Sequence, residues 1–520
     1  MRGIRAGIMS SNRPSAYWPA TLGRILRQHR RKTKWVSRAF GVAYSRMPMG
    51  FPANSPRQAS ASLPRNVHLR SATALVVANI IGAGIFTTTG FQAASLGHPG
   101  LIALLWVLGG ILAWCGAMCY AELGAMKPEA GAEYAYLRDD YGPAFGFMSA
   151  FISLVAGFSA PIAAALKAMV RYLGALIPGL DGDAILPGGI LMEDAIAIGL
   201  VWLLIAIHSS SIRTGFGFND VVTLFKVSGI TLIILAGFAF GNGDTGNFTT
   251  VSSSFEQQTT IGLFSGFSIS LIFVTFCYTG WNAAAYIGHE IRDPQKNLPR
   301  ALFLGTLTVT VLYLGLNALY FYGADVNALS GVAEVGLVAA ESLFGTTGVT
   351  LTVMVLTVSI FASASAMTIA GPRVYFALGR DYRALQFLAG TRAGSSVPVP
   401  ALLLQGAITT LIILSARIDQ IIQYAGFTLA LFSSLAVSSV IVLRWRQPQL
   451  PRPFRVVGYP YTPLLFLVVN IWIMVWNLVG EYWLESLLSL ATVALAAVMF
   501  SLLNRRDRGV ISPSMPPDAP

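Results

Sequence analysis

The sequence predicts an all-α membrane protein with twelve transmembrane helices, and three observations support this fold class. Of the 520 residues, 54% are hydrophobic and only 11% are charged, whereas soluble domains carry about 25% charged residues. Apolar segments long enough to cross a hydrocarbon core of roughly 30 Å recur along the chain. Two of these segments, the first and the sixth, are interrupted near mid-depth by glycine and polar residues.

The apolar segments define the expected helices. Predicted spans fall at residues 71–94, 100–123, 143–174, 194–211, 214–241, 261–289, 298–323, 346–379, 399–415, 420–444, 461–480 and 483–503. The two interrupted spans lie five apart and enter from opposite sides, which is typical of an inverted five-plus-five repeat with a binding site between the breaks. We therefore expect one repeat over about 71–241, a second over about 261–444, and two peripheral helices over about 461–503.

The first span reads Asn79-Ile80-Ile81-Gly82-Ala83-Gly84 in its middle. Each glycine costs about 1 kcal/mol relative to alanine inside a helix, so we expect the helix to break here. A break at that depth must be buried in protein or line a water-filled cavity. Freed N–H groups would then bind an anion and freed carbonyls a cation. The alternative is that the glycines only allow two helices to cross closely.

The sixth span is the expected counterpart, because Phe276-Cys277-Tyr278-Thr279-Gly280-Trp281-Asn282 interrupts its apolar run. In the fifth span, Lys226 lies within the membrane, where charged side chains are costly and usually face the protein interior. Two roles remain open for Lys226: a place on an ion pathway, or a permanent tie between helices through carbonyls and hydroxyls. Ser363 and Ser365 of the eighth span suit close packing, and their hydroxyls could receive the ammonium.

Two further segments carry specific expectations. The loop from Glu122 to Tyr136 contains the helix-stopping Pro128 and two tyrosines, so we expect an interfacial segment, with a contribution to an inner gate as the alternative. Lys167 lies near the outer end of the third span. We expect its side chain to snorkel to the outer headgroups rather than to contact a substrate.

Basic residues are distributed asymmetrically. Of the 21 Lys and Arg residues after residue 70, 17 fall in the even loops and the C-terminus. Because such residues resist translocation, both termini are expected in the cytoplasm, with the protein in the cell membrane (inner or plasma membrane). Residues 506–520 are expected to form a short disordered tail.

Residues 1–70 contain 14 Lys or Arg and no Asp or Glu. We expect a disordered cytoplasmic tail or a gene-start artefact, with true initiation near Met47 or Met49. An organelle transit peptide and a segment held to anionic lipid are the alternatives.

Several function classes are disfavoured. The sequence shows no Ser/His/acid set, nucleotide-binding loop or metal-ligand cluster, so we expect no enzyme activity, no cofactor, no metal and no nucleic-acid partner. The three cysteines, Cys115, Cys119 and Cys277, have neither redox nor zinc spacing and are expected to be structural thiols. The lipid bilayer is the expected surrounding, and the last two spans would offer a surface for a homodimer.

The interrupted spans and their loops resemble the amino acid–polyamine–organocation superfamily, and most closely its L-amino-acid transporter and bacterial amino acid permease branch. The resemblance covers about residues 70–505. It is carried by Asn79-Ile80-Ile81-Gly82-Ala83-Gly84-Ile85-Phe86, Glu122-Leu123-Gly124 with Pro128, Gly131, Tyr134 and Tyr136, Lys226, Tyr278-x-Gly280-Trp281-Asn282, Glu290-x-x-x-Pro294-x-x-Asn297-x-Pro299-Arg300 and Arg373-x-Tyr375.

The resemblance implies a fold like that of sodium-coupled neurotransmitter symporters, with a substrate held at the two breaks. In that family, backbone N–H groups at the first break hold the α-carboxylate, and carbonyls of both breaks hold the α-amino group. A bulky residue of the sixth span closes over the substrate as an outer gate, here Phe276, and Asn282 would form a polar wall. The implied substrate-binding residues are Ile80, Ile81, Gly82, Ala83, Gly84, Phe276, Thr279 and Asn282.

The resemblance also bears on coupling and partners. Lys226 matches a lysine that in many members occupies the place of a sodium ion, which argues against sodium coupling; with Ser363 and Ser365 it forms the implied coupling set. Thr279 stands where glycine is common, which would narrow the pocket. Residues 172–193 contain no cysteine, so no disulfide-linked heavy chain is expected.

Together these features predict a secondary active transporter that moves amino acids by alternating access, as an exchanger or a proton-coupled symporter, independently of sodium. Glu122, Asp220 and Glu290 fall near the inner ends of their spans, so no acidic residue within a span is expected beside the pocket, and neutral L-amino acids are favoured. An amine or polyamine transporter and a non-transporting amino acid sensor are the alternatives.

Overall fold

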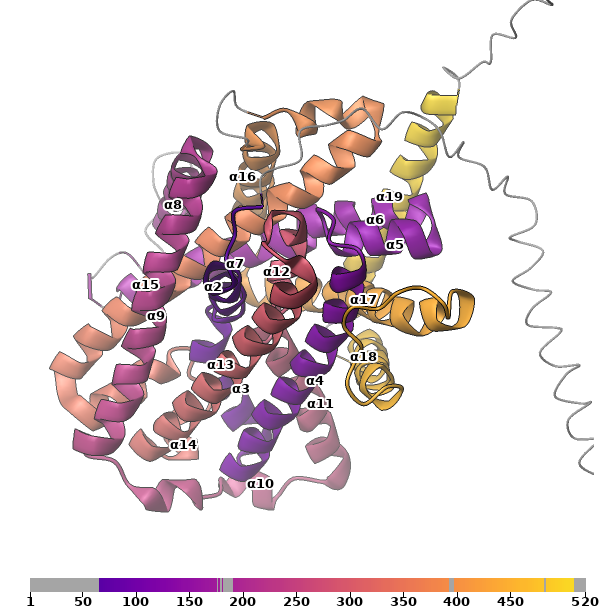
Figure 1. Ribbon diagram of the computed structural model, residues 1–520. Coiled ribbons are helices and arrows are strands. Elements are labelled where there is room, and N and C mark those ends of the chain that lie inside the picture. Colours follow the sequence, from indigo (N-terminus) through magenta and orange to yellow (C-terminus); the bar gives the residue numbers. More distant parts are fainter. Residues whose placement is uncertain are drawn as a thin grey trace, which may run out of the picture. The chain divides into compact units, whose positions relative to one another are not determined.

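A computed structural model describes residues 65–174, 176–177, 180, 190–391, 397–480 and 483–508. These residues are nearly all helical, and they contain no β-strand (Figure 1). The all-α fold class is therefore confirmed. The predicted basic tail lies outside the described residues up to residue 64, as does the predicted C-terminal tail beyond residue 508.

Eleven helical segments of the described chain are long and apolar enough to cross a membrane, and a further apolar helix of 17 residues, α16, completes the predicted set of twelve. Their bounds agree with the predicted spans to within a few residues at most ends. They are α2 (Leu69–Ile80) with α3 (Gly84–Leu96), α4 (Pro99–Met126), α6 (Pro143–Ile152) with η1 (Ser153–Ser159) and α7 (Ala160–Gly174), α8 (Met192–Ser210), α9 (Ile212–Phe240), α11 (Thr260–Cys277), α13 (Pro294–Gly323), α15 (Val335–Asp381), α16 (Val399–Ser415), α17 (Ile418–Arg446), α18 (Tyr461–Val479) and α19 (Trp483–Arg508).

Short helices connect these spans. They are α5 (Glu133–Tyr141), η2 (Thr245–Phe248), α10 (Ser253–Glu256), α12 (Ala283–Tyr286), η3 (Gly288–Glu290), α14 (Val326–Leu329) and η4 (Arg383–Ala389).

Local sequence explains the irregular places in the long helices. Pro161 has no N–H to donate to the carbonyl four residues earlier, and the chain just before it widens into the π-helical segment η1. Gly345 adopts φ +66° and divides α15 into a short and a long helix, which accounts for the predicted eighth span beginning at residue 346. Such positive φ values favour glycine because it has no Cβ.

The helix contacts follow the expected internal repeat. The first part of span one, α2, packs on α9 and α13, which are spans five and seven. The corresponding helix of the second half, α11, packs on α17 and α4, which are spans ten and two. Likewise α9 packs on α15 as α17 packs on α7. The two sets of five spans therefore make equivalent contacts with exchanged roles, as an inverted repeat requires.

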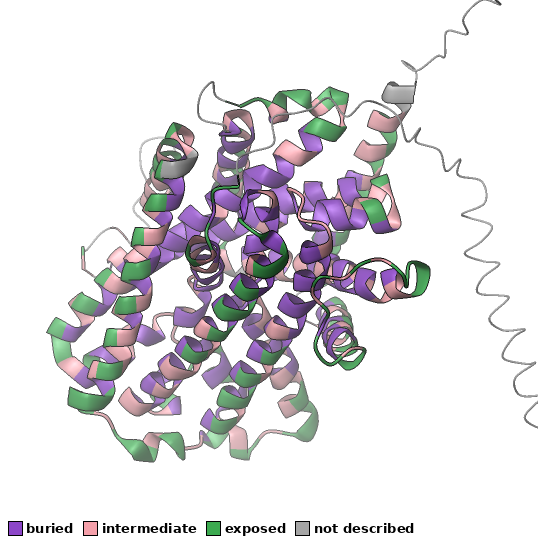
Figure 2. Ribbon diagram, viewed as in Figure 1, coloured by how far each residue is buried: buried purple, intermediate pink, exposed green. Residues whose placement is uncertain are grey.

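Burial separates the central spans from the peripheral ones (Figure 2). In the most apolar stretch of span three, 78% of the residues are buried, against 28% in α9 and 17% in α19. The exposed side chains of these last helices are mostly large and apolar. They suit contact with lipid, since a soluble surface of this kind would be unusual.

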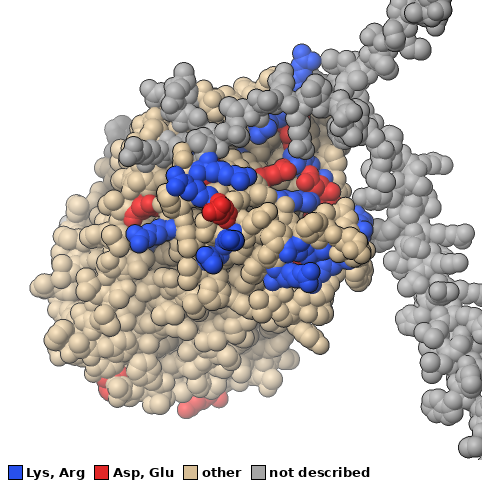
Figure 3. Space-filling view, viewed as in Figure 1, with Lys and Arg blue, Asp and Glu red and all other residues tan. Residues whose placement is uncertain are grey.

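Lys and Arg side chains gather at one end of the face shown in Figure 3, and a broad band without charged side chains lies beside them. We call this region the basic end and define it by four ion pairs that join loops to helix ends. They are Lys127–Asp140 at 2.8 Å, Arg138–Asp381 at 2.6 Å, Arg373–Glu290 at 3.1 Å and Arg444–Glu122 at 2.6 Å.

The expectation that Lys167 snorkels to headgroups is wrong. Its side chain is buried in the protein, and Nζ lies 2.6 Å from Asp194 Oδ1 and donates to the carbonyl of Ile413 at 3.2 Å. Asp194 lies in the first turn of α8, and Ile413 lies on α16. The packing of α7 against α8 and α16 brings Lys167 to both residues. Burying an unpaired ammonium would cost free energy, but the ion pair with Asp194 offsets this cost, so the side chain does not need to reach the headgroups.

Candidate functional site

Both predicted helix breaks are present. The chain leaves helical geometry between α2 and α3 at residues 81–83, and between α11 and α12 at residues 278–282. The two breaks also touch. A Cβ on Gly84 would stand 2.5 Å from Cys277 Sγ, and a Cβ on Gly280, which has φ +97°, would stand 2.9 Å from the backbone carbon of Asn79. The glycines are thus needed for this approach of one break to the other.

Tyr313 of α13 joins the two breaks. Its buried hydroxyl lies 2.8 Å from the carbonyl oxygen of Ile80 and 3.0 Å from that of Cys277. Since one hydroxyl proton can serve only one acceptor fully, the tyrosine is shared between the end of α2 and the end of α11. The ring is held by Trp106, at 5.3 Å between ring centroids and edge to face.

The start of α3 offers unpaired backbone donors. Within the described residues, the N–H groups of Ala83 and Gly84 donate to no backbone carbonyl. The N–H of Gly82 donates to Ile80 across a tight turn, at 2.8 Å. Gly82 and Ala83 are half-buried. A helix N-terminus with free N–H groups is suited to bind an anion such as a carboxylate.

Lys226 lies at the other side of the first break. The side chain is fully buried, and Nζ donates to the carbonyls of Ile81 at 2.7 Å and Ala78 at 3.1 Å. These are carbonyls at the C-terminal end of α2, where the helix dipole favours a cation. The ammonium therefore occupies a position suited to a bound cation.

Ser363 and Ser365 have other surroundings. The hydroxyl of Ser363 is buried without a hydrogen-bond partner in the described chain, and lies 3.5 Å from where a Cβ of Gly82 would stand. The hydroxyl of Ser365 pairs with His208 Nε2 at 2.9 Å. The structure thus places Ser363 beside the first break and Ser365 on a different partner, and Lys226 donates to the carbonyls of Ala78 and Ile81 rather than to either hydroxyl.

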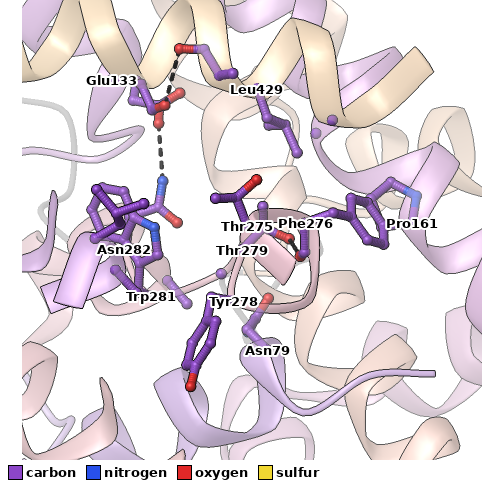
Figure 4. A pocket seen from close by; sticks show the side chains of 18 of the residues that line it. Asn79, Glu133, Pro161, Thr275, Phe276, Tyr278, Thr279, Trp281, Asn282 and Leu429 are labelled. Atoms are coloured by element: carbon purple, nitrogen blue, oxygen red, sulfur yellow. Dashed lines mark hydrogen bonds between the residues drawn. The ribbon is translucent and has the colours of Figure 1, made fainter. Parts of the chain in front are cut away.

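A cavity of about 90 Å³ lies beside the break in span six (Figure 4). Three of the predicted residues, Phe276, Thr279 and Asn282, line it, together with Asn79 of α2. The opposite walls come from η1, α17 and α18 through Phe158, Leu429 and Phe466 among others. Residues 80–84 do not line it. The structure therefore brings the predicted residues to two adjoining places, the N–H groups at the first break and the cavity at the second.

Backbone carbonyls at the breaks are already hydrogen-bonded in this conformation. Phe276 O accepts from the N–H of Thr279 at 2.9 Å and from its hydroxyl at 2.7 Å. Ile80 O accepts from Tyr313 and from Gly82. A ligand amine would have to share or replace these donors, because a carbonyl oxygen offers two lone pairs.

The expectation that no acidic residue lies beside the pocket concerned residues within the spans, and Glu133, which lines the cavity, belongs to the segment between spans two and three. Glu133 is 3% exposed. Its Oε1 accepts a hydrogen bond from Asn282 Nδ2 at 2.9 Å (Figure 4) and another from the hydroxyl of Tyr120. Glu133 begins α5, not a span. A tight reversal at Gly131 and Ala132, with φ +88° and +39°, directs α5 back into the protein.

The two tyrosines of this loop are buried in the protein. Tyr134 and Tyr136, expected at the membrane interface, are each 1% exposed. Tyr134 donates to Asp381 at the end of α15. The N–H of Gly131 donates to the carbonyl of Tyr286 at 3.3 Å, which ties the loop to α12. The loop that ends at Tyr136 is therefore packed against the protein at the basic end, next to α12, and we call it the cover.

Burial sets the electrostatics of this cover. Desolvation raises the pKa of Glu133 above its ordinary value, and hydrogen bonds from Tyr120, Asn282 and Tyr286 oppose that effect only in part. Desolvation also raises the pKa of Asp140, which the neighbouring Lys127 counteracts. The two acids differ in that the described chain provides Asp140 with a basic partner and provides Glu133 with none.

Comparison with known proteins agrees with this architecture. A family model described as amino acid permease matches residues 67–501. The chain is similar to the large neutral amino acids transporter small subunit 2 of Oryctolagus cuniculus, with 30% identity over 81% of this chain and 78% of the relative. It is also similar to two proteins of Mus musculus: the b(0,+)-type amino acid transporter 1, 28% identical over 81% and 84% of the two chains, and the Asc-type amino acid transporter 1, 29% identical over 81% and 78%.

The matched region contains every span, both breaks and the cavity. The match spans far more than half of the chain, and the fold has the broken helices that the resemblance implies. The chain belongs to the amino acid permease family, within the amino acid–polyamine–organocation superfamily, and is a multi-pass membrane protein.

Proposed function

We propose that the chain is a secondary active transporter that moves amino acids across the membrane by alternating access. The observation that carries this proposal is the contact of the two breaks, with unpaired N–H groups at the start of α3 and a cavity at residues 276–282. A zwitterion needs a donor site for its carboxylate and acceptors for its ammonium, and helix ends provide both. The three relatives described above are named as amino acid transporters, which supports the same function.

In this proposal the N–H groups of Gly82, Ala83 and Gly84 bind the α-carboxylate. Carbonyls at Ile80, Ile81 and Phe276, with Thr279, receive the α-amino group after their present donors move. Asn282 forms a polar wall of the cavity, and Phe276 closes the outer side as a gate. These assignments combine the implied roles with the positions of the groups around the two breaks.

Transport is proposed to be independent of sodium. The ammonium of Lys226 supplies a fixed positive charge at the carbonyls of Ala78 and Ile81, so a sodium ion there would meet like-charge repulsion. Exchange of amino acids or symport with protons then provides the driving force. The proposed location is the cell membrane with both termini in the cytoplasm, without a disulfide-linked heavy chain.

Neutral L-amino acids are the proposed substrates, since the name of one relative refers to large neutral amino acids. Amines and polyamines form a second class to test, because Glu133 places a carboxyl group at the cavity. Counterflow in proteoliposomes tests the proposal. Internal unlabelled amino acid should drive accumulation of the same labelled amino acid without sodium, and polyamines should not exchange.

A further inference from the structure

Glu133 differs from the other acidic side chains at the basic end. Six of them have a Lys or Arg nitrogen within 3.2 Å, and these are Glu122, Glu129, Asp139, Asp140, Glu290 and Asp381. In the described chain no ion pair is recorded for Glu133, and the cavity lining contains no Lys, Arg or His. A carboxylate buried among neutral groups is costly and is normally neutralised.

The groups that face Glu133 are neutral on every side. Tyr120 comes from α4, Tyr136 from α5 itself and Tyr286 from α12, and all three are phenols. Phenols ordinarily titrate near pH 10 and remain neutral at physiological pH. From the other helices packed on α5, Arg444 of α17 holds Glu122 and Asp381 of α15 holds Arg138. The pKa of Glu133 is therefore raised by burial, and no charged side chain of these elements offsets that effect.

The hydrogen bonds leave room for a proton. The hydrogen bonds from Tyr120 and Asn282 both end on Oε1, and Tyr286 is a further hydrogen-bond partner of the carboxyl group. One oxygen has two lone pairs, so Oε1 can accept both donors while Oε2 carries a proton. The protonated group would therefore keep the hydrogen bonds that position it, and would lose the charge that burial opposes.

Glu133 also joins two parts that alternating access must separate. It lies on α5, whereas Asn282 is the last residue of the break in span six, and both side chains line the cavity (Figure 4). When the basic end opens, water reaches the carboxyl group and its pKa falls toward the ordinary value for glutamate of about 4.3. A proton bound in the buried arrangement is then released at the basic end.

The geometry points to Glu133 as a proton-binding site that couples proton movement to opening of the basic end. This inference rests on the proposed transport function and adds to it the coupling ion and its residue. Because the pKa of the carboxyl is higher in the buried arrangement, protonation stabilises that arrangement and loss of the proton favours opening. The effect belongs to the pH range between the ordinary and the raised pKa of Glu133.

The experiment uses the full chain in proteoliposomes that contain a pH-sensitive dye. It measures uptake of a labelled amino acid with and without an inwardly directed proton gradient, for wild type, E133Q, E133D and E129Q. Glutamine keeps an acceptor oxygen for Tyr120 and Asn282 but cannot bind the proton. Glu129 is the matched control, since it is an acid of the same loop paired with Arg138 at 3.1 Å and outside the cavity lining.

We expect the gradient to stimulate uptake by wild type and E129Q, with acidification of the lumen. In E133Q the ratio of uptake with and without the gradient falls to one, whatever its absolute rate, and E133D restores part of the stimulation. Y120F provides a second test that leaves the carboxyl in place. Loss of this donor disfavours the ionised form, so the midpoint of the pH dependence moves to higher pH.

Several results would overturn the inference. They are full gradient stimulation in E133Q, an unchanged midpoint in Y120F, and net amino acid uptake by wild type without acidification of the lumen. Selective loss of lysine counterflow in E133Q with an unchanged pH profile would also overturn it, and would assign the carboxylate to a cationic substrate side chain. Absence of wild-type counterflow with every amino acid would instead contradict the proposed function itself.

Discussion

Gly84, the first residue of α3, lies so close to Cys277, the last residue of α11, that a Cβ at position 84 would stand 2.5 Å from Sγ. The next nearest atom, Cys277 Cβ, would lie at 3.4 Å. The sulfur is thus the atom that limits the side chain at position 84. Both residues are buried, so neither can move into solvent to relieve a collision.

Gly84→Ala should lower the rate of amino acid counterflow roughly tenfold or more, since overpacking costs about 1–3 kcal/mol. The double variant Gly84→Ala/Cys277→Ala should recover much of that loss, because the contact at 2.5 Å is removed. Gly84→Leu should abolish binding by filling the space in front of the free N–H groups. Gly199→Ala is the control, as no atom lies within 4 Å of its Cβ position. No recovery in the double variant would contradict the steric explanation.

Tyr313→Phe should slow transport while leaving the fold intact. The variant removes the hydroxyl shared by Ile80 and Cys277 and keeps the ring against Trp106. Loss of a buried hydrogen bond costs about 0.5–1.5 kcal/mol, more where an acceptor is left unpaired. Tyr320→Phe is a matched control on the same helix, since its buried hydroxyl has no partner in the described chain. Equal rates for the two variants would show that the link between the breaks does not matter.

Lys226→Ala should stop or uncouple transport, because it removes the ammonium and leaves the carbonyls of Ala78 and Ile81 unpaired. Unsatisfied buried acceptors cost about 1–3 kcal/mol each. Lys296→Ala, which removes a lysine that is exposed at the start of α13, is the control for charge alone. Uptake is measured with and without sodium. Wild-type uptake by Lys226→Ala in sodium-free buffer would contradict the proposed role.

Lys167→Met should lower the thermal stability of the detergent-solubilised protein markedly, since removing one partner of a buried ion pair costs about 3–5 kcal/mol. The change leaves Asp194 buried without its ammonium. Replacing both partners, as Lys167→Met/Asp194→Leu, should restore much of the midpoint temperature. Arg171→Met is the milder comparison, because that side chain is 45% exposed beside Glu193. A similar loss in the single and the double variant would argue against the pair.

Much of the fold could be predicted because membrane helices follow from local sequence. Apolar length predicted the spans, and Gly82, Gly84 and Gly280 with polar neighbours predicted the two breaks. The position of Lys226 within a span indicated a buried ammonium, and of the two roles left open, the tie through backbone carbonyls agrees with its hydrogen bonds to Ala78 and Ile81. In each case the signal lies within one helix, where the cost of an irregular backbone or a charge in lipid is decisive.

The remaining features depend on packing between distant segments. Glu133 reaches the cavity only because the reversal at Gly131 and Ala132 directs α5 into the protein, and a loop acid has no periodic signal that could indicate this. Lys167 finds Asp194 across an intervening loop, 27 residues further on. An acidic residue directly after a glycine-containing turn, in the loop between spans two and three, is the one signal that could have pointed to Glu133.

Counterflow in proteoliposomes tests the central claim most directly, that two touching helix breaks bind and carry an amino acid. Purified full-length protein is reconstituted, and a panel of labelled amino acids and polyamines is tested with and without sodium. The account predicts sodium-independent accumulation of neutral amino acids that Gly84→Leu abolishes. Accumulation that requires sodium, or that Gly84→Leu leaves unchanged, would contradict it.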